Sequence, residues 1–157
     1  MTISSRDPSF DPRGVLAWGA LWLVVVVVAQ ATRPVMPIDE TRYLAVAWEM
    51  WQRGDLLVPH LNGEPYSHKP PLMFWLINAG WAVFGVEAWW ARVVAPLFGL
   101  GCLALTAALA RQLWPASPRI VCLAPLIVVG SLFFAVFTTL TMFDAVLAFF
   151  ALSGLLG

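Results

Sequence analysis

The sequence is poor in charged residues. Only 11% of its 157 residues are Asp, Glu, Lys or Arg, whereas an average soluble domain carries about 25%. Hydrophobic residues make up 61% of the chain, and its mean hydropathy is +0.80. This composition excludes an ordinary soluble domain and predicts a membrane protein.

Neither sign of charge is in excess. Nine Lys and Arg residues balance nine Asp and Glu residues, so the formal net charge is zero. Without a basic surplus, we expect no nucleic-acid partner and no attraction to an anionic surface through bulk charge. Any function that depends on charge must therefore depend on charge placed locally.

Metal-binding and redox residues are also scarce. The two cysteines, Cys102 and Cys122, lie in apolar runs and follow neither a metal-ligand nor a redox spacing, so we interpret them as packing residues. His60 and His68 stand eight residues apart with only Glu64 between them, which is a poor metal signature. We expect no cofactor and no protein-held metal, and the sequence leaves open whether a divalent cation assists.

Long apolar runs are what the sequence has in quantity. A spanning helix needs about 20 residues, with 17 to 25 tolerated. The first run, 15–31, has this length and follows a polar segment, 1–14, that carries Arg6 and Arg13. No small-residue cleavage site follows it, so we expect an uncleaved span. The other runs are 71–86, 88–110, 120–137 and 142–157.

The positions of the arginines decide which runs cross the membrane, because cytoplasmic loops are enriched in Lys and Arg. If 71–86 crossed, Arg111 and Arg119 would lie outside, against this rule. If 71–86 lies along the outer interface instead, as its short length and its tryptophans favour, both arginines become cytoplasmic. We therefore predict an all-α, polytopic membrane protein with about four transmembrane helices and additional juxtamembrane helices on the outer face. The predicted parts are a cytoplasmic segment (1–14), a first transmembrane helix (15–31), an outer-face loop with amphipathic helices (32–87) and transmembrane helices two to four (88–157), the last one truncated.

The outer loop contains a second kind of helix. "DETRYLAVAWEMWQRGD" begins with Asp39 at a suitable N-cap position and ends at Gly54. Its apolar residues recur with helical spacing, which predicts a short amphipathic helix resting on the membrane. The following stretch, 56–71, is broken by proline and glycine and is expected to be irregular chain. The predicted apolar face consists of Leu44, Ala47, Trp48 and Trp51.

Three charged residues stand out in this topology. Asp39 either caps the helix or serves catalysis. Asp144 lies in an apolar run, where acids are rare unless paired or functional, although it could also cap the last helix. Lys69 precedes Pro70, which favours an extended backbone, and it either binds a lipid phosphate or snorkels to the interface. The predicted topology places Asp39 and Asp144 on the same, outer side.

The outer loop carries a set of short motifs: Asp39-Glu40, Arg42-Tyr43, Gly54-Asp55, Pro59 to Gly63 and His68 to Pro71. Together these motifs resemble those of a known family, the polyprenyl-phosphate-sugar-dependent glycosyltransferases (glycosyltransferase family 39), which contains aminoarabinose lipid A transferases and protein O-mannosyltransferases. "WWARVVAPLFGLGCLALTAALARQLW" is similar to the family's second span, and "TMFDAVLAFF" to the stretch with its second acidic residue. Family members have about a dozen spans and several hundred residues, so this chain resembles an N-terminal fragment.

The resemblance implies a fold of the GT-C type and a function in the bacterial cell envelope. A sugar would pass with inversion from a polyprenyl-phosphate donor to a lipid or protein acceptor, at the periplasmic face of the cytoplasmic membrane. By resemblance, Asp39 contacts or deprotonates the acceptor and Asp144 assists. If the acceptor is itself a phosphate, Asp39 orients it instead. The isolated chain is expected to be inactive, because the later spans that close the lipid cavity have no counterpart. The implied substrate-binding and phosphate-binding residues are Glu40, Arg42, Tyr43, His68 and Lys69.

A non-enzymatic function is the alternative. The chain could be a small polytopic membrane protein, or part of a transporter, that binds lipid head groups through its charged loop. A transporter would place polar or broken helices near the bilayer midplane. Here the polar residues concentrate in the outer loop, which favours chemistry on a lipid at the interface. The sequence leaves the sugar and the acceptor open.

Overall fold

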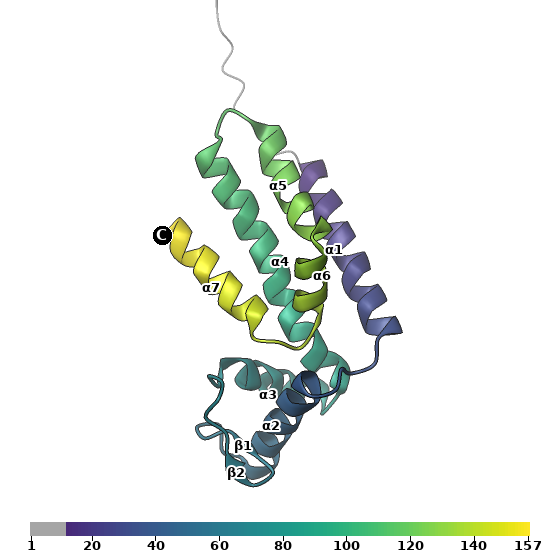
Figure 1. The fold of residues 1–157 in the computed structure, drawn as a ribbon, viewed down its shortest axis with the longest axis vertical. Coiled ribbons are helices and arrows are strands. Elements are labelled where there is room, and N and C mark those ends of the chain that lie inside the picture. Colours follow the sequence, from purple (N-terminus) through teal and green to yellow (C-terminus); the bar gives the residue numbers. More distant parts are fainter. Residues whose placement is uncertain (1–11) are drawn as a thin grey trace, which may run out of the picture.

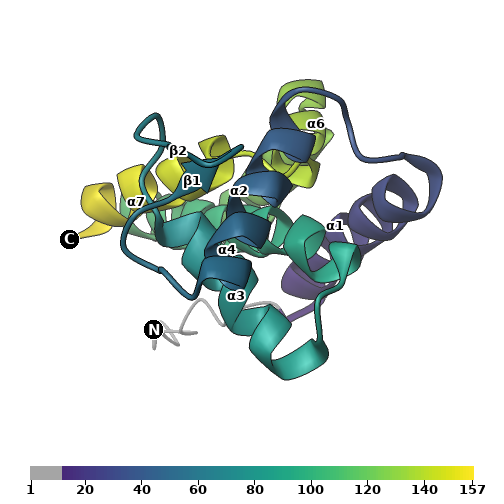
Figure 2. The same ribbon diagram turned by 90° about the horizontal axis from the view of Figure 1, so that it is seen from below.

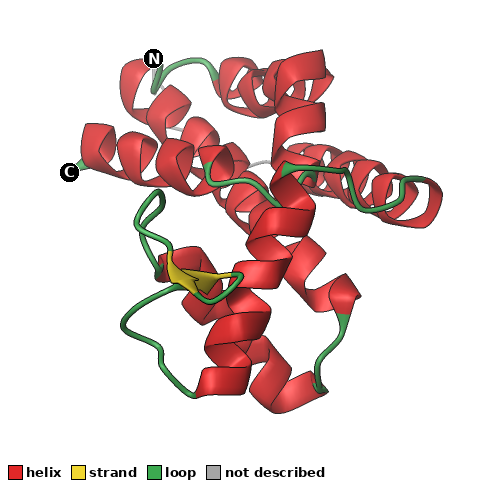
Figure 3. Cartoon of the chain, turned by 60° about the horizontal axis from the view of Figure 1, so that its bottom comes forward, coloured by secondary structure: helices red, strands yellow, loops and turns green. Residues whose placement is uncertain are grey.

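The computed structural model of the protein describes residues 12–157, so the prediction for residues 1–11 of the cytoplasmic segment lies outside the described residues. The described chain is helical except for one very short hairpin (Figure 1, Figure 3). Its elements are α1 (Pro12–Thr32), α2 (Asp39–Arg53), β1 (His60–Leu61), β2 (Glu64–Pro65), α3 (Leu72–Phe84), α4 (Ala88–Leu113), α5 (Pro118–Gly130), α6 (Leu132–Thr139) and α7 (Asp144–Leu156).

The helices form two groups. In Figure 1, α1, α4, α5, α6 and α7 make a bundle, and α2, α3 and the hairpin lie together at its lower end. Seen from below, α2 and α3 pass in front of the end of α4 (Figure 2). Helix α4 is central, since it packs against α1, α3, α5, α6 and α7. The connection between α4 and α5 lies at the opposite end of the bundle from α2 (Figure 1).

The helices follow the predicted apolar runs, but their lengths differ from those of four full spans. Among the described residues, α4 alone is long and apolar enough to cross a membrane, or two spans result if α5 and α6 count as one bent span. These two helices meet at 69°, because Ser131 has an extended backbone that interrupts the helix after Gly130. The 13 residues of α7 rise about 20 Å, less than the roughly 30 Å of a bilayer core. The all-helical architecture is confirmed. The predicted number of about four spans is larger than the one or two spans that the helix lengths support among the described residues.

Helix α3 covers the run 71–86 and packs against α2 and α4. Gly80 allows a close approach to α4, because a Cβ atom there would lie 1.7 Å from the indole nitrogen of Trp90. The same nitrogen donates a hydrogen bond to the Leu76 carbonyl at 3.1 Å. One apolar core joins α2, α3, the start of α4 and the α6–α7 turn, and a second lies among α1, α4, α5 and α6.

The buried face of α2 differs from the predicted one. Trp48 and Trp51 are 40% and 37% exposed, although each ring lies edge to face with that of Trp81, with centroids 6.3 Å apart. The helix turns a neighbouring stripe inward because α3, and not only a membrane surface, covers it. The N-cap position is Ile38, so that Asp39 stands in the first turn instead of at the cap. The buried residues of α2 are Glu40, Tyr43, Val46, Ala47 and Met50.

The stretch 56–71 contains a hairpin where irregular chain was expected. β1 and β2 pair antiparallel, with Leu61 opposite Glu64. The two residues between them, Asn62 and Gly63, both have positive φ (56° and 87°), as a two-residue hairpin turn requires. Asn-Gly is the strongest short signal for such a turn, so the sequence did carry this information.

Candidate functional site

Asp39 stands at the start of α2, where the positive end of the helix dipole favours a carboxylate. Its side chain is about half exposed, and its Oδ1 accepts a hydrogen bond from Nη2 of Arg42 at 3.2 Å. Ile38, directly before it, has φ 80° and ψ −70°, a conformation that costs a β-branched residue of order 1–3 kcal/mol. Such strain is found where the surrounding structure holds the chain in place, and it tends to occur at functional sites.

Tyr43 lies one turn further along α2 and is buried. Its ring contacts that of Phe143 edge to face, with centroids 5.1 Å apart. Burial raises the pKa of the Tyr43 phenol above its ordinary value, and the negative charges of Asp39 and Asp144 add to this rise. Both predicted catalytic carboxylates therefore act on the same phenol.

Lys69 and His68 lie in the loop that leads into α3, and both are exposed. The Nζ atom of Lys69 stands 5.7 Å from the centroid of the Phe143 ring, within the range of a cation–π interaction. Among the described residues, no carboxylate lies within 4 Å of this ammonium group. The His68 ring stacks on that of Tyr66, with centroids 5.2 Å apart. The Lys69 ammonium group thus lies by an aromatic ring and has no carboxylate partner in the described part of the chain.

Asp144 is the first residue of α7 and is exposed. Phe143 occupies the N-cap position, and no side chain forms a capping hydrogen bond there. Asp144 therefore does not serve α7 as a side-chain cap, which was one of its two interpretations. Phe143 links it to the other residues, since its ring touches Tyr43 and lies beneath Lys69.

Glu40 differs from its neighbours because it points into the protein and is only 1% exposed. Its Oε2 accepts hydrogen bonds from the backbone N–H of Met36 at 2.7 Å and from Nη1 of Arg33 at 3.3 Å. Its Oε1 accepts the backbone N–H of Thr141 at 2.7 Å. The predicted site residues thus divide into two groups. The outward set consists of the polar residues that are at least partly exposed: Asp39, Arg42, His68, Lys69 and Asp144. Glu40 is the one inward carboxylate.

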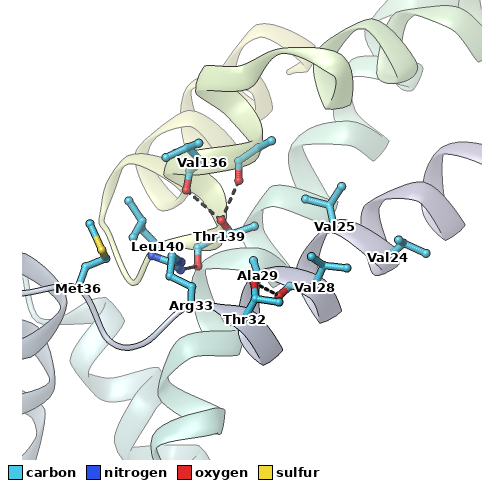
Figure 4. A pocket seen from close by; sticks show the side chains of 11 residues that line it. Val24, Val25, Val28, Ala29, Thr32, Arg33, Met36, Val136, Thr139 and Leu140 are labelled. Atoms are coloured by element: carbon cyan, nitrogen blue, oxygen red, sulfur yellow. Dashed lines mark hydrogen bonds between the residues drawn. The ribbon is translucent and has the colours of Figure 1, made fainter.

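A groove of about 420 Å³ lies between α1 and α6 (Figure 4). Its walls are mainly valine and alanine side chains, with Arg33 and Thr139 at one end. Neither Asp39 nor Asp144 lines it. The two candidate catalytic acids therefore lie outside this groove. Within the described part of the chain, no three His, Cys, Asp or Glu side chains are grouped so that they could hold a metal ion.

Comparison with known proteins decides the family. Residues 13–157 match the family described as dolichyl-phosphate-mannose-protein mannosyltransferase. The chain belongs to this family. The match covers nearly the whole chain and includes every residue of the candidate site, and it confirms the predicted family membership.

Several bacterial relatives of this mannosyltransferase-family chain are named undecaprenyl phosphate-alpha-4-amino-4-deoxy-L-arabinose arabinosyl transferase. The one from Pseudomonas savastanoi pv. phaseolicola is 40% identical over 82 residues, which cover 52% of this chain and 15% of the relative. The first such enzyme of Pseudomonas fluorescens Pf-5 is 34% identical over 103 residues, which cover 66% of this chain and 18% of the relative. The chain therefore spans less than a fifth of the length of these relatives.

Solved structures agree with the family assignment. The crystal structure of ArnT from Cupriavidus metallidurans bound to undecaprenyl phosphate superposes with a TM-score of 0.78 at 28% identity, over 88% of this chain and 25% of that one. The apo structure of the same protein gives a TM-score of 0.71. The arrangement of helices described above is thus also found in a family member of known structure.

Three residues of the site were not predicted from the sequence. Phe143 is the aromatic centre of the outward set, and Arg33 and Thr141 bind the inward carboxylate. Arg33 carried a weak signal. The predicted topology puts it on the outer side, whereas the rule that cytoplasmic loops are rich in Lys and Arg favours the other side. Thr141 acts through its backbone N–H, so its side chain gives no signal. Phe143 is one of ten phenylalanines in an apolar chain, and only its place beside Asp144 distinguishes it.

Proposed function

We propose that this chain forms the outer-face donor and acceptor site of a larger glycosyltransferase in the bacterial cytoplasmic membrane. The enzyme would transfer a sugar from a polyprenyl phosphate to a lipid or protein acceptor, with inversion. The observation that carries the proposal is the gathering of Asp39, Lys69 and Asp144 around the rings of Tyr43 and Phe143 at one end of the bundle. The undecaprenyl phosphate named for the Cupriavidus structure supports a polyprenyl phosphate as the donor's carrier.

The chemistry assigns a separate task to each charge. An acceptor oxygen attacks the anomeric carbon, the bond from that carbon to the phosphate oxygen breaks, and the polyprenyl phosphate leaves with the electron pair. Asp39 takes the proton of an acceptor hydroxyl, which is typically worth about 10² to 10⁴ in rate. Lys69 and Arg42 stabilise the negative charge that develops on the phosphate. Asp144 assists from α7 by orienting the acceptor.

The exposed Lys69 suits a phosphate that arrives from the bilayer. Its ammonium has no carboxylate partner within 4 Å among the residues described, and the Phe143 ring beneath it leaves its outer side free for an anion. Arg42, in contrast, shares its charge with Asp39 at 3.2 Å. We therefore assign the main phosphate contact to Lys69, while Arg42 also orients the Asp39 carboxylate.

The test is a sugar-transfer assay of the larger enzyme that contains this chain, in native membranes with a polyprenyl-phosphate-sugar donor. Asp39→Asn is expected to lower kcat by at least about a hundredfold, the lower end of general-base catalysis, with unchanged membrane insertion. Asp55→Asn is the matched control, since Asp55 lies beyond the C-terminus of α2 and binds only the backbone of its own loop. Wild-type turnover in Asp39→Asn would refute the catalytic assignment.

A binding assay tests the phosphate contact separately. Lys69→Ala should weaken binding of polyprenyl phosphate by this chain in detergent by about tenfold, the value of one charge-assisted hydrogen bond. Arg53→Ala removes an exposed cation from the other end of α2 and should leave binding unchanged. Equal losses in both variants would indicate attraction by general charge only, and would remove Lys69 from the site.

A further inference from the structure

We infer that Glu40 is a positioning residue: its buried carboxylate ties the start of α2 to the α6–α7 turn and so fixes the separation of Asp39 and Asp144. The inference rests on the proposed function for its catalytic meaning. It concerns a residue for which the family resemblance suggested contact with substrate. The tie itself can be tested without any enzyme activity.

All of the hydrogen bonds of Glu40 go to the protein. Oε1 accepts the Thr141 N–H at 2.7 Å, and Oε2 accepts the Met36 N–H at 2.7 Å and one arm of Arg33 at 3.3 Å. With 1% of the residue exposed, neither oxygen is open to an incoming ligand. A carboxylate in this position binds two segments of chain, the α1–α2 connection and the α6–α7 turn, and has no surface left for substrate.

Arg33 forms a second hydrogen bond to the α6–α7 turn, beside that of Glu40. Its Nη2 donates to the Thr139 carbonyl at 2.7 Å, and Figure 4 shows the side chain reaching this group. The Arg33–Glu40 pair therefore holds the carbonyl of Thr139 and the N–H of Thr141, two backbone groups on either side of one residue. The backbone of Arg33 is fixed in turn, because its carbonyl accepts Nη2 of Arg92 at 2.8 Å. The turn is thus bound by two charged side chains, Arg33 at the Thr139 carbonyl and Glu40 at the Thr141 N–H.

The tie joins the two segments that carry the candidate catalytic acids. Asp39 is the residue before Glu40, and Asp144 follows Thr141 by three positions, although Glu40 and Thr141 are 101 residues apart in the chain. The other direct link between these segments is the apolar contact of the Tyr43 and Phe143 rings, which leaves the backbone groups of the α6–α7 turn to Glu40 and Arg33. The bond from Glu40 to the Met36 N–H also closes the loop that contains Ile38, which holds Ile38 in its strained conformation.

The chemistry calls for a carboxylate at this position. A glutamine offers one accepting oxygen, and its NH₂ group would face a backbone N–H or the Arg33 guanidinium, both of which are donors. Glu40→Gln can therefore satisfy one side of the tie and must lose the other. The chain provides a matched control in Glu49, on the same helix, whose carboxylate accepts the N–H groups of Asn62 and Gly63 and so ties α2 to the hairpin instead.

Hydrogen exchange of the wild-type chain and its variants in detergent tests the tie. In Glu40→Gln, either the peptides covering 139–146 or those covering 33–41 should exchange about tenfold faster, according to which side of the tie the amide group loses, while peptides covering 60–66 should not change. In Glu49→Gln, peptides covering 60–66 should exchange faster, and the other two regions should not change. Unchanged exchange at both 139–146 and 33–41 in Glu40→Gln would overturn the inference. If that variant does not fold, Glu40→Asp keeps the ion pair with Arg33 but is one methylene short of Thr141, and the same comparison applies.

The transfer assay tests the catalytic meaning. Misplacing a catalytic group by about 1 Å can cost about a hundredfold in rate, so Glu40→Gln should lower kcat by about that factor and leave the KM for the donor within about twofold. A raised KM with unchanged kcat would instead show that Glu40 contacts substrate, and the inference would be wrong. If the larger enzyme that contains the wild-type chain transfers no sugar, the proposed function fails while the exchange experiment still decides whether Glu40 ties the two segments together.

Discussion

Replacing Gly80 by alanine tests how closely α3 packs against α4. The position of the loop that carries Lys69 depends on this packing. The new methyl carbon would lie 1.7 to 2.3 Å from three atoms of the Trp90 indole, far inside van der Waals contact. This ring cannot move freely, because its nitrogen donates to the Leu76 carbonyl and its face packs against Phe84, with centroids 5.1 Å apart. Either the indole or the helix must move.

The magnitude follows from these contacts. Overpacking a well-filled interior costs about 1–3 kcal/mol, and loss of the hydrogen bond from Trp90 to Leu76 costs about 1 kcal/mol more. Alanine regains about 1 kcal/mol through its higher helix propensity. Gly80→Ala should therefore lower the free energy of unfolding by about 1–3 kcal/mol. Gly19→Ala in α1 is the control, because no atom lies within 4 Å of its new methyl group.

Denaturant unfolding in detergent, followed by circular dichroism, measures the difference. Gly19→Ala should be neutral or gain up to about 1 kcal/mol, so the two variants should differ by about 1–4 kcal/mol. A Trp90→Leu background removes the colliding ring, and Gly80→Ala should cost little there. Equal stability of the two alanine variants in the wild-type background would mean that α3 does not lie on Trp90, and the described end of the bundle would be wrong.

Three further changes test single interactions of the site region. The pKa of Tyr43 is raised by burial and by nearby carboxylates, so the folded protein should become less stable as the pH rises above about 10, where only the unfolded chain loses the phenol proton. Melting curves at about pH 9 to 11 should show that Tyr43→Phe removes this loss of stability. Two backbone N–H groups lower the pKa of Asp55, so the ionised Asp55 carboxylate should stabilise the folded protein above about pH 4 and stop doing so as the pH falls below that value. Melting curves across this pH range should lose the dependence in Asp55→Asn. Arg33→Met leaves the Glu40 carboxylate buried without its ion-pair partner, and it should cost about 3 kcal/mol of unfolding free energy, the low end for such losses because Arg33 is itself partly exposed.

The positions of the helices could be predicted because the bilayer makes apolar runs and charged interruptions conspicuous. The runs 15–31 and 88–110 correspond to α1 and α4, and 71–86 to the separate α3. The break between α5 and α6 was missed, since a single Gly130-Ser131 pair in an apolar run gives little warning. The hairpin turn at Asn62 was missed for another reason: its signal was present, but the surrounding prolines suggested irregular chain.

The members of the candidate site could be proposed from the sequence, but the directions of their side chains could not. Asp39, Lys69 and Asp144 are charged residues in an apolar chain, and this contrast, together with the family resemblance, marked them as candidates. Which way a side chain points depends on partners that may lie anywhere in the chain, and Glu40 follows Asp39 directly yet faces the interior because α2 advances about 100° per residue. The sequence could not indicate that its partner is a backbone group of Thr141, since every residue except proline has an N–H.

The separation of 101 residues between Glu40 and Thr141 has a consequence for biosynthesis. A ribosome adds about 5–20 residues each second, so about 5–20 s pass between the synthesis of the two partners. During that time Arg33, only seven residues earlier, is the neighbour that can neutralise the carboxylate. The turn before α7 therefore completes the arrangement last, and a nascent chain inserted up to α6 would display Asp39 and Lys69 without the second acid. Such a chain could attract an anionic lipid before it could act on one.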